Sequence, residues 1–240
     1  MRCFSFHRVY NYERGGVIMI NIGQIVLDNF RKNFEITEND IGSDAVLKKN
    51  MMKFVTRTYD IKDYGHLCIM NMEGMLGLMK METVILVPFD KDVPLVDFDY
   101  ISAMGKETYI AEFYRYMLKE YPEEYVSELA KCPEQYPELG EYNSGEHWYD
   151  SEKYYCSCGK TGKKSADKFT QITRAYIDTF CKQVVKMEKC DREAKTAEIR
   201  RFAETLVAKG GPAVDTFKKM FGEEMTRRIV LENMYGLKRL

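Results

Sequence analysis

Histidine is scarce in this chain of 240 residues, which contains only His7, His66 and His147. Three scattered histidines exclude a histidine-rich metal site and the paired histidines of an HExxH zinc helix. No GxGxxG follows a predicted strand, and neither GxxxxGK[ST] nor GxSxG occurs. The chain therefore carries no sequence signature of a dinucleotide site, a phosphate-binding loop or a serine-hydrolase nucleophile.

The chain also lacks an apolar run long enough to cross a bilayer and the pattern of a secretory signal peptide. Its cysteine count, seven, is odd, which favours reduced thiols over a disulfide framework. The formal net charge is -1, so no global charge attracts nucleic acid or an anionic membrane. We therefore expect a cytoplasmic globular protein with neither nucleic acid nor a membrane as a partner.

What the chain does contain is a central block of apolar, β-forming segments. Turn signals such as Glu73-Gly74 and Gly105 divide this block, and the enrichment in valine, isoleucine, tyrosine and phenylalanine indicates strands. The predicted strands are 53–61, 66–72, 75–89, 93–104 and 107–116. Connections this short allow only antiparallel pairing, because a parallel crossover needs a dozen or more residues.

Helical patterns lie on both sides of this block. Before it, 20–34 reads as an amphipathic helix, and 37–50 as a short helix with Thr37 at its N-cap. After it, we predict a helix near 122–131, a loop over 159–168, a long helix over 165–188, and shorter helices that end at Gly210, Gly222 and Gly236. The order of elements predicts an α+β fold, a three-layer α/β/α sandwich with a central antiparallel sheet.

The first 18 residues show no periodicity and read as an N-terminal extension. Arg14-Gly15-Gly16 can be encoded by a purine-rich tract that resembles a ribosome-binding site shortly before Met19. We hypothesise that translation begins at Met19, and we expect 19–240 to form a single domain, a size sufficient for one hydrophobic core.

Two acidic residues, Glu82 and Asp99, lie within apolar runs, where a carboxylate is costly unless it is paired or used. If they point to the same face of neighbouring strands, they form a pair with one carboxyl protonated and the other ionised. The alternative is that Asp97 and Asp99, two residues apart, share a solvent-exposed face while Val96 and Phe98 face the core.

Three stretches, in order, resemble a known family. They are VPLVDFD (93–99), HWYDSEKYY (147–155) and GPAVDTFKKMFGEEMTRRIVLENMYGL (211–237). Together they resemble the ferredoxin-dependent bilin reductases and the related red chlorophyll catabolite reductases, and the likeness extends from about residue 50 to the end. Asp99 falls on the family's proton-donating aspartate and Glu82 near a histidine that partners it. Gly211 falls where many members have a second catalytic aspartate, Asp97 replaces a usual glycine, and Met225 replaces a usual tryptophan.

The resemblance implies a reductase of a linear tetrapyrrole, with single electrons from reduced ferredoxin, protons from side chains and no bound cofactor. It implies catalytic roles for Asp99 and Glu82. We predict in addition that Met70, Met81, Asp97 and Gly211 bind the substrate. A different class of function stays open: a non-catalytic protein that binds haem or a bilin on the same fold, which the replaced acids favour.

The remaining candidates have ordinary interpretations. Met70 and Met81 belong to a methionine-rich strand pair, which serves either as core or as an adaptable wall for a flat aromatic ligand. Cys156 and Cys158 provide too few ligands for a metal, so no metal site is predicted. Lysines near 160–164 and 182–189 suit a solvated face, an acidic electron donor or the propionates of a substrate.

Overall fold

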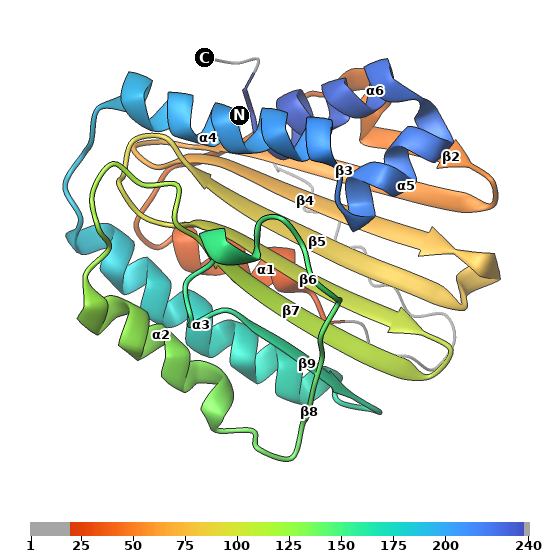
Figure 1. Ribbon diagram of the computed structural model, residues 1–240, viewed down its shortest axis with the longest axis horizontal. Helices are drawn as coiled ribbons and strands as arrows, with labels where there is room; N and C mark the ends of the chain where they lie inside the picture. The colour runs from red at the N-terminus through yellow and green to blue at the C-terminus, as the bar shows by residue number, and fades with distance from the viewer. Residues whose placement is uncertain (1–19, 238–240) are drawn as a thin grey trace, which may run out of the picture.

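The computed structural model describes residues 20–237, and the predicted extension over 1–18 and the hypothesis about Met19 lie outside the described residues. A large antiparallel sheet forms the middle of the molecule, with helices on both of its faces (Figure 1). The predicted α+β fold, a three-layer sandwich with a central antiparallel sheet, is confirmed.

The sheet has nine strands in the order β1-β3-β4-β5-β6-β7-β9-β8, with β2 paired beside β3. The strands are β1 (Ile36–Asn39), β2 (Val46–Lys49), β3 (Met52–Ile61), β4 (Gly65–Gly74), β5 (Met79–Pro88), β6 (Leu95–Ala103), β7 (Lys106–Tyr114), β8 (Gly140–Glu141) and β9 (Cys158–Gly162). From β3 to β7, neighbours in sequence are neighbours in space, because each is joined to the next by a connection too short for a crossover.

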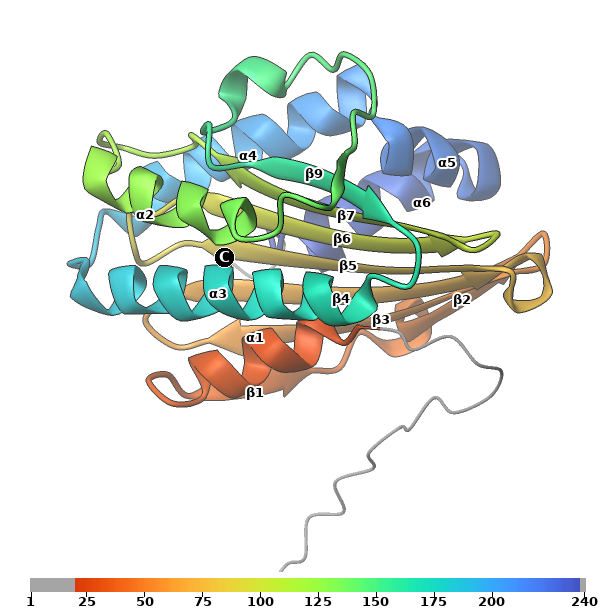
Figure 2. The same cartoon turned by 90° about the horizontal axis from the view of Figure 1, so that it is seen from below.

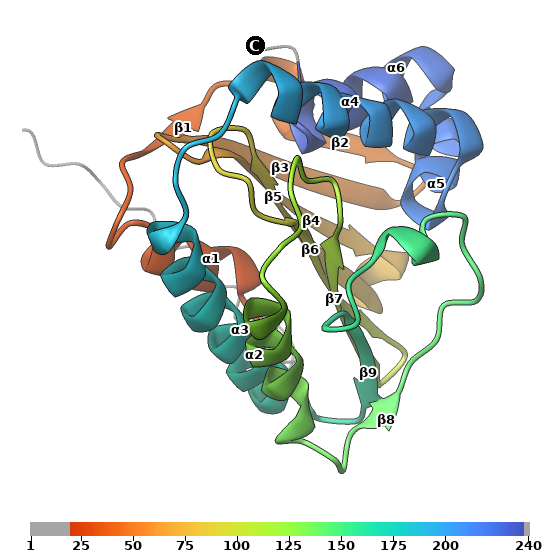
Figure 3. The ribbon, with the colours of Figure 1, turned by 60° about the vertical axis from the view of Figure 1, so that its left-hand side comes forward.

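One face of the sheet is covered by α1 (Ile22–Phe30), α2 (Glu123–Glu134) and α3 (Ala166–Lys186). The other face is covered by α4 (Arg192–Lys209), α5 (Pro212–Phe221), α6 (Glu223–Arg228) and a π-helical turn (Ile229–Met234). Figures 2 and 3 show the two helical layers on opposite sides of the strands. Alternation along each strand sends side chains to both layers, so the protein has two hydrophobic cores separated by the sheet.

The predicted helix over 37–50 is wrong. Ile36–Asn39 pairs with one part of β3 and Val46–Lys49 with another, and a short 3₁₀ turn (Gly42–Ala45) joins them. The carboxylate of Asp40 accepts the backbone N–H of Gly42 at 2.8 Å in this turn rather than capping a helix. Both segments pair with the edge of β3, which gives hydrogen-bond partners to their backbone N–H and C=O groups. This pairing stabilises the strands more than the weak capping sequence stabilises a helix.

Two further predictions are corrected. The loop expected over 159–168 contains β9, which pairs with β7 from Glu107↔Gly162 to Ala111↔Cys158. The long strand expected over 75–89 begins only at Met79, because Met75–Gly77 forms a tight turn with positive φ angles at Met75 and Leu76. Residue propensities mispredict both segments. Glycine and lysine in 159–168 favour a loop, and the apolar residues of 75–78 favour a strand.

Candidate functional site

Three carboxylates lie together on the face of the sheet covered by α4, α5 and α6. Asp97 is paired with Ile85 on one neighbouring strand and with Glu112 on the other, and Asp99 is paired with Thr83. Directly paired residues project to the same face, so Asp97, Asp99 and Glu112 share one side of β6 and β7. Phe98 and Tyr100 point to the opposite face, into the core under α3.

Hydrogen bonds hold two of these carboxylates. The Thr83 hydroxyl donates to Asp99, and the Tyr114 hydroxyl donates to Glu112 at 2.5 Å. The ammonium of Lys153 lies 2.6 Å from Glu112 and joins it in a half-buried ion pair. Within residues 20–237, the Oδ1 atom of Asp97 is buried and has no hydrogen-bond partner.

Burial in this group changes the acidity of the aspartates. Loss of hydration raises the pKa of Asp99 to about 6, although the hydrogen bond from Thr83 works in the opposite direction. Burial also raises the pKa of Asp97 well above its ordinary value, and the negative charges of Asp99 and Glu112 raise it further. Because like charges disfavour full ionisation, the aspartate pair retains a proton at higher pH than isolated aspartates would.

Aromatic side chains surround the carboxylates. The ring centroid of Tyr114 lies 6.1 Å from that of Tyr149 and 5.0 Å from that of Phe202, and Phe202 lies 5.8 Å from Tyr235. Burial, followed by the nearby carboxylates, raises the pKa of the phenols of Tyr114, Tyr149 and Tyr235, which therefore stay neutral. The site thus combines proton-holding carboxyls with buried, mutually packed aromatic rings and neutral phenols.

The expected pairing of Glu82 with Asp99 is wrong. Glu82 is paired with Tyr100, one position away from the Thr83–Asp99 pair, so its side chain points to the face opposite Asp99. It accepts the backbone N–H of Ile22 at 2.6 Å and that of Gly23 at 3.4 Å, at the beginning of α1. Glu82 therefore anchors a helix N-terminus, where the unpaired N–H groups favour an acceptor.

The burial of Glu82 predicts a dependence of stability on pH. Burial raises its pKa from 4.5 to about 7, in spite of the two N–H donors. Between these values the unfolded chain releases the proton and the folded chain keeps it, so stability is full below pH 4.5 and falls as pH rises to 7. We expect the free energy of unfolding of the wild type, relative to Glu82→Gln, to fall by about 3 kcal/mol across this window.

Urea unfolding of both chains at several pH values measures this difference, since groups common to the two chains cancel. A difference in unfolding free energy between the two chains that stays constant with pH would contradict the prediction. A wild type that gains stability with pH would show that the N–H donors outweigh burial and that Glu82 is ionised.

The other residues predicted to bind substrate lie on the same side of the sheet as Asp99. Met70 is paired with Thr83 and Met81 with Ile101, which places both side chains on the Asp99 face. Gly211 is the N-cap of α5, and a Cβ atom there would lie 3.5 Å from the ring of Tyr149. The sequence placed Asp97 and Asp99 on one face, and the structure adds Met70, Met81 and the start of α5 at Gly211 to the same side. The roles of these residues toward a ligand stay predictions.

Sequence reasoning missed Glu112, Tyr114, Tyr149, Lys153 and Tyr235. One signal for Glu112 was present: it lies within the apolar run IAEFY, as Glu82 and Asp99 lie within theirs. The tyrosines had no such signal, because β7, the segment before β9 and the C-terminal turn meet only in the tertiary structure.

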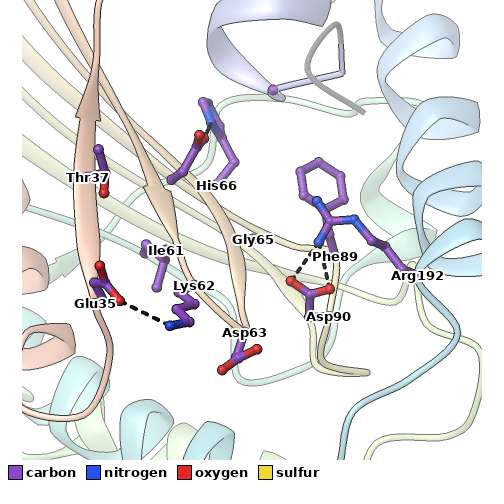
Figure 4. A pocket seen from close by; sticks show the side chains of 12 residues that line it. Glu35, Thr37, Ile61, Lys62, Asp63, Gly65, His66, Phe89, Asp90 and Arg192 are labelled. Atoms are coloured by element: carbon purple, nitrogen blue, oxygen red, sulfur yellow. Dashed lines mark hydrogen bonds and ion pairs between the residues drawn. The ribbon is translucent and has the colours of Figure 1, made fainter.

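Two clefts lie elsewhere, near the turn between β3 and β4. One, of about 380 Å³, is lined by residues that include Asp60, His66, Phe89 and Arg192 (Figure 4). The other, of about 460 Å³, is lined by residues that include Phe34, Lys62 and Lys189. In the first cleft, Arg192 forms an ion pair with Asp90, and Lys62 forms one with Glu35. These four charged side chains are therefore paired within the cleft. Asp97, Asp99 and Glu112 do not line either cleft.

Among residues 20–237, no group of three or more histidine, cysteine, aspartate or glutamate side chains is arranged to hold a metal ion. Cys156 is buried and Cys158 nearly so, and burial raises the pKa of their thiols to about 12 and about 11. Both thiols are therefore protonated at neutral pH, a form that binds metals poorly. Within the same residues, no helix is both long and apolar enough to span a bilayer.

Comparison with known proteins identifies the fold. No family model and no curated protein matches the sequence. Among solved structures, the chain is similar to phytochromobilin synthase from tomato in complex with biliverdin, with a TM-score of 0.68 and 12% sequence identity. The similarity covers 90% of this chain and 83% of that one. The protein therefore has the fold of phytochromobilin synthase, as the sequence resemblance implied.

Proposed function

We propose that the protein binds a linear tetrapyrrole on the sheet face that carries Asp97, Asp99 and Glu112, and that it reduces this ligand. The observation that carries the proposal is the convergence of these carboxylates on one face, with the pKa values of both aspartates raised. The fold, shared with a protein whose structure contains biliverdin, supports the choice of ligand class.

Reduction of one double bond of a bilin consumes two electrons and two protons. We propose that a ferredoxin-like protein supplies the electrons one at a time, with no cofactor bound to the enzyme. Asp99 donates a proton to the ligand radical, because a carboxyl with a pKa of about 6 is partly protonated near neutral pH and transfers its proton readily. Solvent then restores the proton to the Asp97–Asp99 pair, which delivers the second proton after transfer of the second electron.

A second candidate is a protein that binds a tetrapyrrole without reducing it. Gly211 favours this alternative, because a glycine at the start of α5 contributes no acidic side chain to the site. The carboxylates would then serve to hold pyrrole N–H groups, which are hydrogen-bond donors.

Absorption spectroscopy separates these functions. We expect biliverdin to change its visible spectrum when mixed with the protein, because ordering against the aromatic rings fixes its conformation. On addition of reduced ferredoxin under anaerobic conditions, we expect the bound bilin to be converted to a product of shorter-wavelength absorption.

Haem serves as the comparison ligand in the same titration. A spectral change with biliverdin but no conversion would support the binding protein and contradict the reductase. No change with either ligand would contradict both functions.

A further inference from the structure

One end of the sheet carries large apolar side chains in the turns of three successive hairpins. These turns join β2 to β3, β4 to β5, and β6 to β7, and the strand register places them at the same end. They lie at the right-hand end of the sheet in Figures 1 and 2. The exposed residues are Met51 (77%), Met75 (49%), Leu76 (91%), Leu78 (62%) and Met104 (81%). We call these five residues the hairpin-tip cluster.

The backbone at these turns makes the apolar residues costly. Met51, Met75, Leu76 and Met104 have φ values of 59°, 53°, 57° and 49°, in the left-handed region. Glycine and asparagine are the residues that favour this region, and they dominate two-residue hairpin turns. The turns Asn50-Met51 and Met104-Gly105 have positive φ at both positions. In each turn one residue, Asn50 or Gly105, suits this conformation, and the other is a methionine, which does not. Neither turn formation nor solubility accounts for the methionines.

Lysines accompany the tips in a repeated arrangement. Lys49 and Lys53 lie two residues from Met51, Lys80 lies two residues from Leu78, and Lys106 lies two residues from Met104. Two residues of strand correspond to roughly 6–7 Å, so the backbone of each lysine is set back from an apolar tip by that depth. Over 48–53, 73–80 and 103–106 the charged residues are five lysines (Lys48, Lys49, Lys53, Lys80 and Lys106) and one acid, Glu73.

We propose that the hairpin-tip cluster docks on an anionic membrane surface. Side chains that enter an interface reach about 5–10 Å below the headgroups, and basic groups set back by that depth meet the lipid phosphates. The three hairpins are side by side in the sheet, about 10 Å apart, and form a row of projections that suits a flat surface. The local basic charge complements an anionic bilayer although the whole chain has a formal net charge of -1. The proposal thus replaces the expectation, drawn from the net charge alone, that no membrane is a partner. This inference is independent of the function proposed above.

Flotation of the full chain with lipid vesicles tests the proposal. We expect binding to vesicles of phosphatidylcholine with phosphatidylserine, little binding to phosphatidylcholine alone, and weakening of the binding as salt is raised. The variant Met51→Gly, Leu76→Asn, Met104→Asn creates Asn-Gly at two turns and suits each backbone angle, so it should fold at least as stably. Its vesicle partition coefficient should fall about tenfold or more.

Val185→Asn is the matched control, because Val185 is 48% exposed and lies on α3, away from the hairpin tips. This control should bind vesicles as the wild type does. Failure of the wild type to bind either vesicle, or equal binding by the triple variant, would overturn the proposal. Concentration-dependent dimerisation in the absence of lipid, abolished by the triple variant, would also overturn it and assign the cluster to a second copy of the chain.

Discussion

Replacing Asp99 by Asn is expected to slow reduction of the bilin by about 10²–10⁴-fold and to leave its binding within a few-fold of the wild type. Asn keeps the size and polarity of the side chain and still accepts a hydrogen bond from the Thr83 hydroxyl, but it cannot deliver a proton. Single-turnover reduction of bound biliverdin measures the rate, and titration of its absorption measures the affinity.

The pH dependence gives this prediction a second readout. Asp99 loses its proton as pH rises through its pKa, so the fraction of enzyme that can donate a proton falls. The rate should therefore decline above about pH 6 in the wild type. The hydrogen bond from Thr83 lowers the pKa of Asp99, so Thr83→Val should move this decline to higher pH. A role for Thr83 in packing alone would not move the pH profile.

Asp97→Asn is the matched variant, two residues along the same strand and on the same face. We expect it to change the affinity for the bilin more than the rate, because its proposed role is binding. If Asp99→Asn reduces the ligand at the wild-type rate, Asp99 is not the donor. If only Asp97→Asn loses activity, the two roles are reversed.

Replacing Lys195 by Met is expected to destabilise the fold by about 3–5 kcal/mol, the cost of breaking a buried ion pair. The side chain of Lys195 is fully buried in α4. Its ammonium group donates to Asp92 at 3.0 Å, to the carbonyl of Val93 at 2.9 Å and to the carbonyl of Tyr116 at 2.7 Å. Met fills the space but leaves the buried carboxylate of Asp92 without its counter-charge and the carbonyls of Val93 and Tyr116 without the ammonium donor.

Asp92 shows why this single lysine matters to the whole site. Its carboxylate also accepts the backbone N–H groups of Leu118 at 2.9 Å and Lys119 at 2.8 Å. The cluster therefore ties the beginning of α4 to the segment before β6 and the segment after β7, the strands that carry the site carboxylates. Loss of Lys195 should loosen the helical layer over the site as well as lower the stability.

Urea unfolding followed by circular dichroism measures the loss. Arg227→Met is the control, since its ion pair with Glu204 is solvent-exposed and such pairs contribute about 0–1 kcal/mol. An equal effect of the two substitutions would contradict the assigned role of Lys195. The double variant Lys195→Met, Asp92→Asn should lose less than the sum of the two single variants, because it removes the unpaired charge.

Much of the fold could be predicted from the sequence. The strand segments around Val84 and Phe98 and the helix around Tyr176 have strong local patterns, and the structure confirms each element. The predictions failed where long-range pairing decides the conformation: Ile36–Asn39 and Val46–Lys49 become strands beside β3, and Cys158–Gly162 becomes a strand beside β7. Weak local preference yields to backbone pairing at a sheet edge.

For the site, the sequence by itself determined that Asp97 and Asp99 share a face, since alternation along a strand fixes this for any pair two residues apart. It also indicated which carboxylates are embedded in apolar runs. Only the tertiary structure decided which face of the sheet each carboxylate occupies and which side chains lie beside it. The register between β5 and β6 sent Glu82 to the start of α1 and not to Asp99, and the register between β6 and β7 brought Glu112 beside Asp97. A shift of one residue in register reverses every side chain of a strand. The register depends on the length and type of the turn that joins the two strands, and the apolar composition of the strands did not reveal these turns.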